Sequence, residues 1–273
     1  MSIFRISRNG FLALGTFIFL LPYIWMLSTA AKPQDEIFTS TLSLIPKNWA
    51  LFDNIGKALT RVPMAQIMLN GIFICLLILV VQVVVAIPCA YAMAKLKFRG
   101  ARFMIALVML GLLVPIHATA LPLYVAFSNL SILNSYTAMG LPFFISVFGI
   151  FLFTQFFKAL PDDLLHAARL DGMSELGIIA RVVVPNAWPA ITAFSIFSVV
   201  AHWNDLFWPL IVITDINKAT PPLGLLYFRA AESGSDYGVL MAATLIITLP
   251  LVLAFLFAQR RFIEGITLTG LKG

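Results

Sequence analysis

Residues 103–157 read FMIALVMLGLLVPIHATALPLYVAFSNLSILNSYTAMGLPFFISVFGIFLFTQFF, a run of 55 residues without Asp, Glu, Lys or Arg. A charged side chain at the centre of a bilayer is costly, so such a run indicates membrane-spanning segments. About 20 apolar residues cross the hydrocarbon core as a helix, so this run is too long for one span and long enough for two. The polar stretch 128–135 supplies a turn between them, and we expect helices over roughly 103–127 and 137–157.

The rest of the chain has the same character. Of its 273 residues, 61% are hydrophobic and 11% are charged, whereas soluble domains carry about 25% charged residues. Further apolar segments predict spans at roughly 11–31, 66–94, 186–213 and 238–258. The sequence therefore predicts an all-α protein, a polytopic membrane helical bundle in which residues 1–273 form a single transmembrane domain of about six helices.

The distribution of positive charge predicts the orientation of these spans. With the N-terminus in the cytoplasm, the cytoplasmic segments carry 12 Lys and Arg residues and the external segments carry 6. Because Lys and Arg concentrate in cytoplasmic loops, both termini are expected there. Residues 28–30 resemble a signal-peptide cleavage site, but the apolar run before them exceeds the usual core of about 7–15 residues, which favours a retained span.

Small residues and prolines shape the expected helices. Ala86, Ala90 and Ala94 form a stripe at four-residue spacing that would allow another helix to approach closely. Because proline interrupts helical hydrogen bonding, helices that contain it are expected to bend or break, although ordinary packing explains most single prolines in membrane helices. The prolines in or beside the spans are Pro22, Pro88, Pro115, Pro122, Pro142, Pro185, Pro189, Pro209 and Pro250.

The cytoplasmic segment 158–185 has the pattern of a structured unit. Pro161 with two following aspartates is typical of a helix start, and Gly172 is typical of a helix end. Ser174 is a good cap for a second helix. A short helix that rests on lipid is the alternative, but the acidic residues Asp162, Asp163, Asp171 and Glu175 favour a protein partner over an anionic membrane surface.

This segment resembles the cytoplasmic signature of ABC importer permeases, which reads Glu-Ala-Ala, three residues, Gly, nine residues, then Ile-x-Leu-Pro. Ala167, Ala168, Gly172 and Pro185 match that signature at the required spacing, and His166 replaces the usual Glu. The stretches 203–210 and 259–273 are similar to the maltose-type, carbohydrate-importing branch of the family. The resemblance implies a cytoplasmic coupling helix that contacts an ATPase, and the residues it assigns to this role are His166, Ala167, Ala168, Asp171, Gly172 and Pro185.

The resemblance also implies partners and a location. It implies a second homologous permease, two cytoplasmic ATPase subunits that bind ATP and Mg²⁺, an extracytoplasmic solute-binding protein, and a sugar or sugar-like solute. The chain itself would carry no cofactor and would lie in the bacterial plasma (inner) membrane as a multi-pass protein. No basic patch with interleaved aromatic residues is present, so a nucleic-acid partner is not expected.

Polar side chains within apolar spans are candidates for the substrate path because they are costly to bury in lipid. The polar residues of this kind are Asn70, Gln82, His117, Thr119, His202, Asn204 and Asp205. We assign His117, Trp203, Asn204 and Asp205 to the substrate path, with an amide and a carboxylate suited to hydroxyl groups and an indole suited to a sugar face. Two alternatives stay open. In the first, Trp203 serves as an anchor at the membrane–water interface, with Asp205 at the outer end of the 186–213 helix. In the second, His117 makes a structural hydrogen bond instead of contacting the solute.

Other functional classes find little support in the sequence. There is no Gly-x-x-x-x-Gly-Lys-[Ser/Thr] phosphate loop, so ATP hydrolysis by this chain is not expected. No Cys, His and acid cluster has metal-ligand spacing. A stand-alone secondary transporter or channel is the alternative function, but such proteins usually place several ionisable groups within the membrane, and here only Asp205 qualifies.

Overall fold

The computed structural model describes residues 2–39, 43–228 and 236–270, and every regular element in these ranges is helical. The chain divides into two compact units, one formed by Met1–Gln66 with Leu223–Pro250 and the other by Ile67–Pro222 with Leu251–Gly273. The fold class predicted from the sequence is confirmed.

The first unit contains α1 (Ser2–Ala30), a 3₁₀ turn (Gln34–Glu36), α2 (Leu51–Arg61), the last residues of α13 (Pro221–Leu225), a second 3₁₀ turn (Leu226–Phe228) and the start of α14 (Tyr237–Gly270). The buried amide of Asn54 on α2 donates hydrogen bonds to the carbonyl oxygens of Ala30 and Lys32, both at 2.9 Å. These bonds tie α2 to the end of α1 by satisfying carbonyls that a helix end leaves unpaired.

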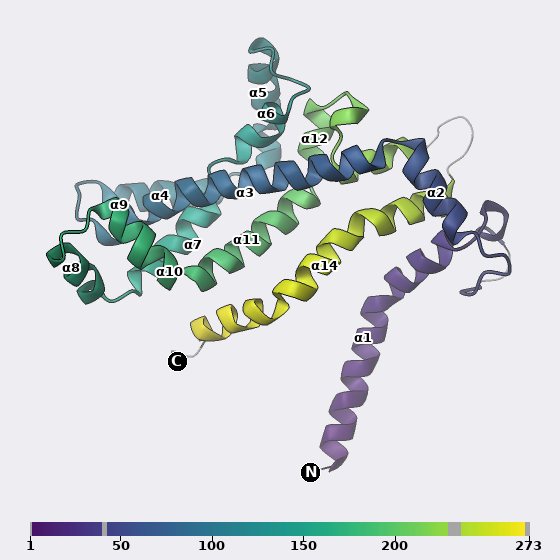
Figure 1. Cartoon of the computed structure of the whole chain (residues 1–273), viewed down its shortest axis with the longest axis horizontal. Helices are drawn as coiled ribbons and strands as arrows, with labels where there is room; N and C mark the ends of the chain where they lie inside the picture. The colour runs from purple at the N-terminus through teal and green to yellow at the C-terminus, as the bar shows by residue number, and fades with distance from the viewer. Residues whose placement is uncertain (1, 40–42, 229–235, 271–273) are drawn as a thin grey trace. The chain divides into compact units, whose positions relative to one another are not determined.

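The second unit contains the remaining helices (Figure 1). They are α3 (Met64–Lys95), α4 (Ala101–Gly111), α5 (Ile116–Asn129), α6 (Tyr136–Gly140), α7 (Val147–Lys158), α8 (Asp162–Leu170), α9 (Glu175–Ile178), α10 (Val184–Asn186), α11 (Trp188–Trp203) and α12 (Phe207–Val212). A 3₁₀ turn at Leu141–Phe143 joins α6 to α7, one π-helical turn at Ile179–Val183 joins α9 to α10, and a last 3₁₀ turn covers Ile216–Lys218.

Four helices in the described part of the chain are long and apolar enough to cross a membrane: Arg8–Ala30, Met64–Lys95, Tyr136–Lys158 and Tyr237–Phe257. Two helix pairs are bent, α4 with α5 by 94° and the α9–α10 stretch with α11 by 79°, and counting each pair as one span gives six. Large apolar side chains on these helices are exposed, for example Phe19 at 80% and Phe257 at 84%. In a bilayer such surface contacts lipid or another subunit.

Two of the expected spans are interrupted in the structure. The helix expected over 103–127 stops at Gly111 and restarts at Ile116, because Pro115 has an extended backbone (ψ 137°) and no N–H to continue the ladder. The helix expected over 186–213 ends at Trp203, and the short α12 begins at Phe207. Pro88, by contrast, lies inside the continuous helix α3, as expected for a proline that serves packing.

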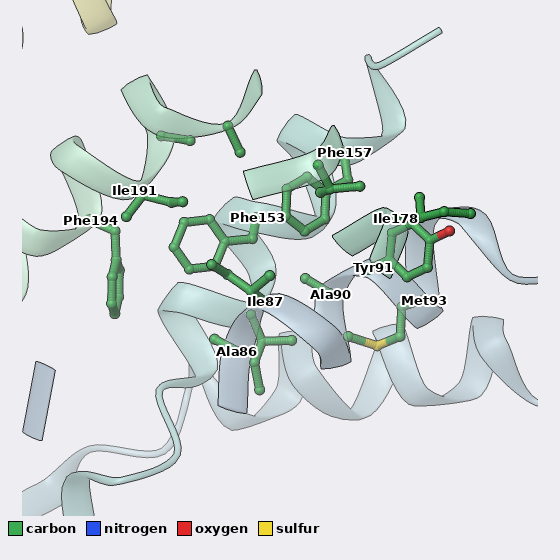
Figure 2. Packing of buried hydrophobic residues seen from close by; sticks show 14 of the residues in the cluster. Ala86, Ile87, Ala90, Tyr91, Met93, Phe153, Phe157, Ile178, Ile191 and Phe194 are labelled. Atoms are coloured by element: carbon green, nitrogen blue, oxygen red, sulfur yellow. The ribbon is translucent and has the colours of Figure 1, made fainter. Parts of the chain in front are cut away.

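The core of the second unit lies where α3, α7 and α11 meet the 158–185 segment (Figure 2). Ala86 and Ala90 of α3 are fully buried in one cluster with Phe153 and Phe157 of α7. The ring of Phe153 also meets Phe194 of α11 edge to face at 5.2 Å. The alanine stripe predicted close approach by another helix, and two of its residues, Ala86 and Ala90, lie in this cluster with side chains from α7 and α11.

Candidate functional site

Helix α8, at the centre of the expected coupling segment, begins and ends as its sequence predicts. Pro161 precedes the helix, and Asp162 and Asp163 lie in its first turn, where the helix dipole favours negative charge. At its end Gly172 N–H donates to the Arg169 carbonyl and Met173 N–H to the Ala168 carbonyl. This is a Schellman motif, and it requires the left-handed conformation that Gly172 adopts (φ +77°).

The chain then returns toward the membrane through a tight corner. The hydroxyl of Ser174 accepts a hydrogen bond from Gly177 N–H at 3.2 Å and caps α9, as expected. The π-helical turn precedes Pro185, which is exposed, and the helix axis then bends by 79° before α11. π-helical turns are frequent at functional sites. Pro185 therefore shapes a corner of the segment.

The two alanines of the signature face opposite ways. Ala168 is 5% exposed and belongs, with Leu165, to the buried core of its own unit. Ala167 and His166 are exposed, together with Asp171 and Gly172 at the end of the helix. The expectation that Ala168 contacts a partner is therefore wrong in its detail, because a rotation of about 100° per helical residue turns its side chain inward.

The N-terminal end of α8 is fastened to α3. The ammonium group of Lys95, in the last turn of α3, donates to the Asp162 carboxylate and to the Leu160 carbonyl, both at 2.6 Å. The Asp162 carboxylate is exposed, and the hydrogen bond and positive charge of Lys95 lower its pKa from the ordinary value. It is therefore ionised at neutral pH, as this ion pair requires.

The C-terminal end of α8 is linked to α3 through Glu175, which binds Tyr91, one helical turn before Lys95. Arg169 Nε donates to Glu175 Oε1 at 2.8 Å, and the buried Tyr91 of α3 donates its hydroxyl hydrogen to Glu175 Oε2 at 2.5 Å. The hydrogen bond from Arg169, followed by that from Tyr91, lowers the pKa of Glu175. Nothing in the sequence pattern joins Tyr91 to this segment, so sequence reasoning missed this contact.

A second candidate site is a cavity of about 230 Å³, which we call the His202 cavity. Its lining residues are Ile116, His117, Phe143, Ala201, His202, Asp205, Phe207 and Trp208. The break at Pro115 starts α5 at this cavity, and the break after Trp203 brings Asp205 to it. Two irregularities in the spans therefore create the space, in line with the rule that broken helices at membrane depth line cavities.

Two of the four residues assigned to the substrate path line this cavity, namely His117 and Asp205. Trp203 does not: it is 4% exposed, and its ring lies so close to Gly71 of α3 that a Cβ there would meet it at 3.3 Å. Asn204 is exposed outside the lining, and its amide donates to the Val200 carbonyl at 2.8 Å within its own helix. Trp203 therefore has a packing role.

Sequence reasoning left six of the eight cavity residues unassigned: Ile116, Phe143, Ala201, His202, Phe207 and Trp208. His202 was recognisable as a polar residue inside an apolar span, which is the signal that could have found it. The rings of His202 and Phe143 lie 4.8 Å apart, and those of His117 and Phe207 lie 4.4 Å apart. The cavity thus combines aromatic walls with one carboxylate and two imidazoles. Among the described residues no group of three or more His, Cys, Asp or Glu could hold a metal ion.

The chain was compared with known protein families. Residues 82–267 match the family described as binding-protein-dependent transport system inner membrane component. This match covers both candidate sites, from α3 through the coupling segment to α14.

Individual relatives match over nearly the whole chain. The arabinooligosaccharides transport system permease protein of Bacillus subtilis is 32% identical, over 100% of this chain and 97% of that protein. The sn-glycerol-3-phosphate transport system permease protein of Salmonella typhi is 30% identical, over 96% and 95% of the two chains.

Among solved structures, the fold is similar to a chain in the crystal structure of a bacterial ABC transporter involved in the import of the acidic polysaccharide alginate. The TM-score is 0.83 at 22% identity, and the match covers 96% of this chain and 97% of that one. The alternative of a stand-alone secondary transporter or channel does not hold against these matches. The chain belongs to the family of binding-protein-dependent transport system inner membrane components, and it is a multi-pass permease subunit of an ABC importer.

Proposed function

We propose that this permease subunit imports a neutral sugar or polyol across the bacterial plasma membrane. It acts with a second homologous permease, two cytoplasmic ATPase subunits that hydrolyse ATP, and an external solute-binding protein. Both termini lie in the cytoplasm. The observation that carries the proposal is the coupling segment, in which a short helix with an exposed polar face is anchored at both ends to the long span α3.

The exposed face of the coupling segment has the composition of a protein-docking surface. Leu170 and Leu176 are 90% and 74% exposed, and Leu164 is 46% exposed. Large apolar side chains clustered among polar residues mark protein contacts. His166 and Ala167 of the same segment are also exposed. We therefore assign docking on an ATPase subunit to Leu164, His166, Ala167, Leu170 and Leu176.

The bonds that anchor α8 to α3 would transmit movement of the docking surface to the membrane-spanning helices. A rigid helix moves as a unit, so closure of the ATPase subunits would displace whatever is bonded to α8. Asp162 and Glu175 bind Lys95 and Tyr91, so α3 would move together with α8. The core packing of Leu165 and Ala168 adds α7 and α11.

The solute class follows from the His202 cavity and from the relatives. None of its eight lining residues is Lys or Arg, and Asp205 supplies a carboxylate that accepts hydrogen bonds from hydroxyl groups. Its aromatic walls suit the apolar face of a sugar ring. The relative named for arabinooligosaccharides fits this chemistry better than the one named for sn-glycerol 3-phosphate, whose anionic group a carboxylate repels.

The test is ATP hydrolysis by the reconstituted importer, stimulated by the binding protein loaded with an arabino-oligosaccharide. We expect Ala167→Trp to abolish most of the stimulation, because the bulky ring stands on the docking face, and Ala167→Ser to retain it. Ala168→Trp is unsuited to this test, because overpacking the core destabilises the chain itself by about 1–3 kcal/mol. Full stimulation in Ala167→Trp would refute the assignment of this face.

A further inference from the structure

Beside the His202 cavity, buried hydrogen bonds link Gln82 of α3 to residues of α11 and of the turn before α7. Gln82 of α3 is 4% exposed, and its amide reaches three partners from two other parts of the chain. Its Nε2 lies 2.8 Å from the Phe143 carbonyl and 3.3 Å from His202 Nε2. Its Oε1 accepts the hydroxyl hydrogen of Ser198 at 2.6 Å.

The carbonyl of Phe143 fixes which way the Gln82 amide points. A backbone carbonyl oxygen only accepts hydrogen bonds, so the amide atom beside it must be the nitrogen. The opposite orientation would bring two acceptor oxygens together at 2.8 Å in a buried place. The hydroxyl of Ser198 is compatible with this assignment, because it donates to the amide oxygen that remains.

The orientation of the amide determines the state of His202. One N–H of the amide serves the Phe143 carbonyl, and the other faces His202 Nε2. If His202 Nε2 carried a proton, its N–H would face the N–H of the Gln82 amide, and two donors cannot form a hydrogen bond. This ring nitrogen must therefore carry a lone pair. The imidazole is then uncharged and its single proton lies on Nδ1. The ring of His202 lines the cavity. We infer that Nδ1–H, the one donor left on the ring, is the group that it presents there.

We propose that Gln82 is a positioning residue that holds His202 as an uncharged, Nδ1-protonated imidazole and so gives the cavity one directed N–H donor. Together with the Asp205 acceptor, this donor selects a hydroxylated, uncharged solute, because a hydroxyl group both accepts and donates. A charged imidazolium would instead favour an anionic solute. This consequence rests on the proposed function, whereas the state of the imidazole does not.

Nitrogen NMR of the assembled importer in lipid bilayers tests the proposal without any solute. Only this chain carries ¹⁵N-histidine, and its three histidines are assigned by loss of signal in His117→Gln and His166→Gln. At neutral pH we expect His202 to show a protonated Nδ1 and a bare Nε2. A protonated Nε2 in the wild-type protein would overturn the proposal.

Variants of Gln82 test whether this residue sets the tautomer of His202. Gln82→Met removes the hydrogen bond at similar side-chain length, and Gln82→Asn withdraws the amide by one methylene while staying polar. In both, we expect the ratio of Nε2–H to Nδ1–H tautomers to rise about fivefold, the equivalent of one hydrogen bond of about 1 kcal/mol. An unchanged ratio in both variants would show that Gln82 does not position the ring.

The matched control is Ser195→Ala, one helical turn from Ser198. Its hydroxyl donates to the Ile191 carbonyl of its own helix at 2.7 Å, so its loss should leave the tautomer unchanged. A shift in this control as large as that in the Gln82 variants would overturn the proposal, because it would show that any polar loss on α11 moves the ring. The readout measures no import, so failure of the importer to carry sugar would refute the proposed function and not this assignment.

Discussion

Asp205 lies between α11 and α12, and its side chain contacts the start of α12 as well as the His202 cavity. Asp205 Oδ1 accepts a hydrogen bond from Trp208 N–H at 3.3 Å at the start of α12, and the side chain also lines the His202 cavity. A carboxylate at the start of a helix satisfies backbone donors, and this bond does so for α12. Lining the cavity is an additional property that helix capping does not require.

Replacement of Asp205 by Asn separates these two roles. Asn caps helices about as well as Asp, so α12 should persist, while the charged acceptor is lost from the cavity. We expect Asp205→Asn to raise the KM for import of a neutral sugar about tenfold, as for loss of a charged hydrogen bond of about 1.5 kcal/mol. Transport kinetics in proteoliposomes provide the measurement.

Asn204→Ala is the matched control for that prediction. The Asn204 amide donates to the Val200 carbonyl and lies outside the cavity lining, so its removal should leave KM unchanged. Equal KM values for Asp205→Asn and the wild type would place the solute elsewhere, for example mainly against the second permease.

At the scale of elements, hydrogen bonds join both ends of the α8 region to α3. The two anchors on α3, Tyr91 and Lys95, are four residues apart and therefore on the same face of that helix. They hold the two ends of a helix nine residues long. These bonds connect the coupling segment to α3, which is distant from it in sequence.

Loss of both anchors should uncouple hydrolysis from import. Lys95→Met and Tyr91→Phe keep the side-chain volume but remove the bonds to Asp162 and Glu175. In the double variant we expect binding-protein-stimulated ATP hydrolysis to persist, because the docking face is intact, while sugar imported per ATP falls several-fold. Hydrogen exchange of residues 160–178 should rise in parallel.

The control for this pair is Tyr124→Phe. Tyr124 lies on α5, and its side chain is 38% exposed. Its variant should keep the wild-type ratio of sugar imported to ATP hydrolysed. If the double variant also keeps that ratio, α3 does not carry the motion of α8.

At the scale of the whole molecule, six spans would leave both ends of the chain on one side of the membrane. The four long helices and the two bent pairs supply this number. The C-terminal fusion site, Gly273, lies outside the described residues, so its sidedness is a prediction from charge alone.

Reporter fusions test this topology directly. A reporter after Gly273 should be active as a cytoplasmic marker, and one inserted between α1 and α2, in the 32–50 segment, should be active as an external marker. The excess of Lys and Arg in the predicted cytoplasmic segments is the physical reason. The same sidedness at both positions would require an even number of spans between them, instead of the five that this topology predicts, and would overturn the assignment of the bent pairs.

The sequence by itself determined whatever depends on the bilayer or on neighbours along the chain. The membrane demands long apolar runs, so the fold class could be predicted from composition and charge spacing alone. The start and end of α8 followed from Pro161, Asp162 and Gly172, since caps act over a few residues. The family signature rests on the same local residues, because its spacing is that of one helix and one turn.

Only the tertiary structure decided which side chains meet across the molecule. Gln82 and His202 are 120 residues apart in sequence, and Tyr91 and Glu175 are 84 apart, so no local pattern joins them. The same limit explains the errors at Trp203 and Ala168: an indole or a methyl group has no preferred face until neighbouring helices have packed. In this chain nearly every residue of a span is apolar, so hydrophobic periodicity cannot distinguish core, cavity and lipid, and contacts between helices make that distinction.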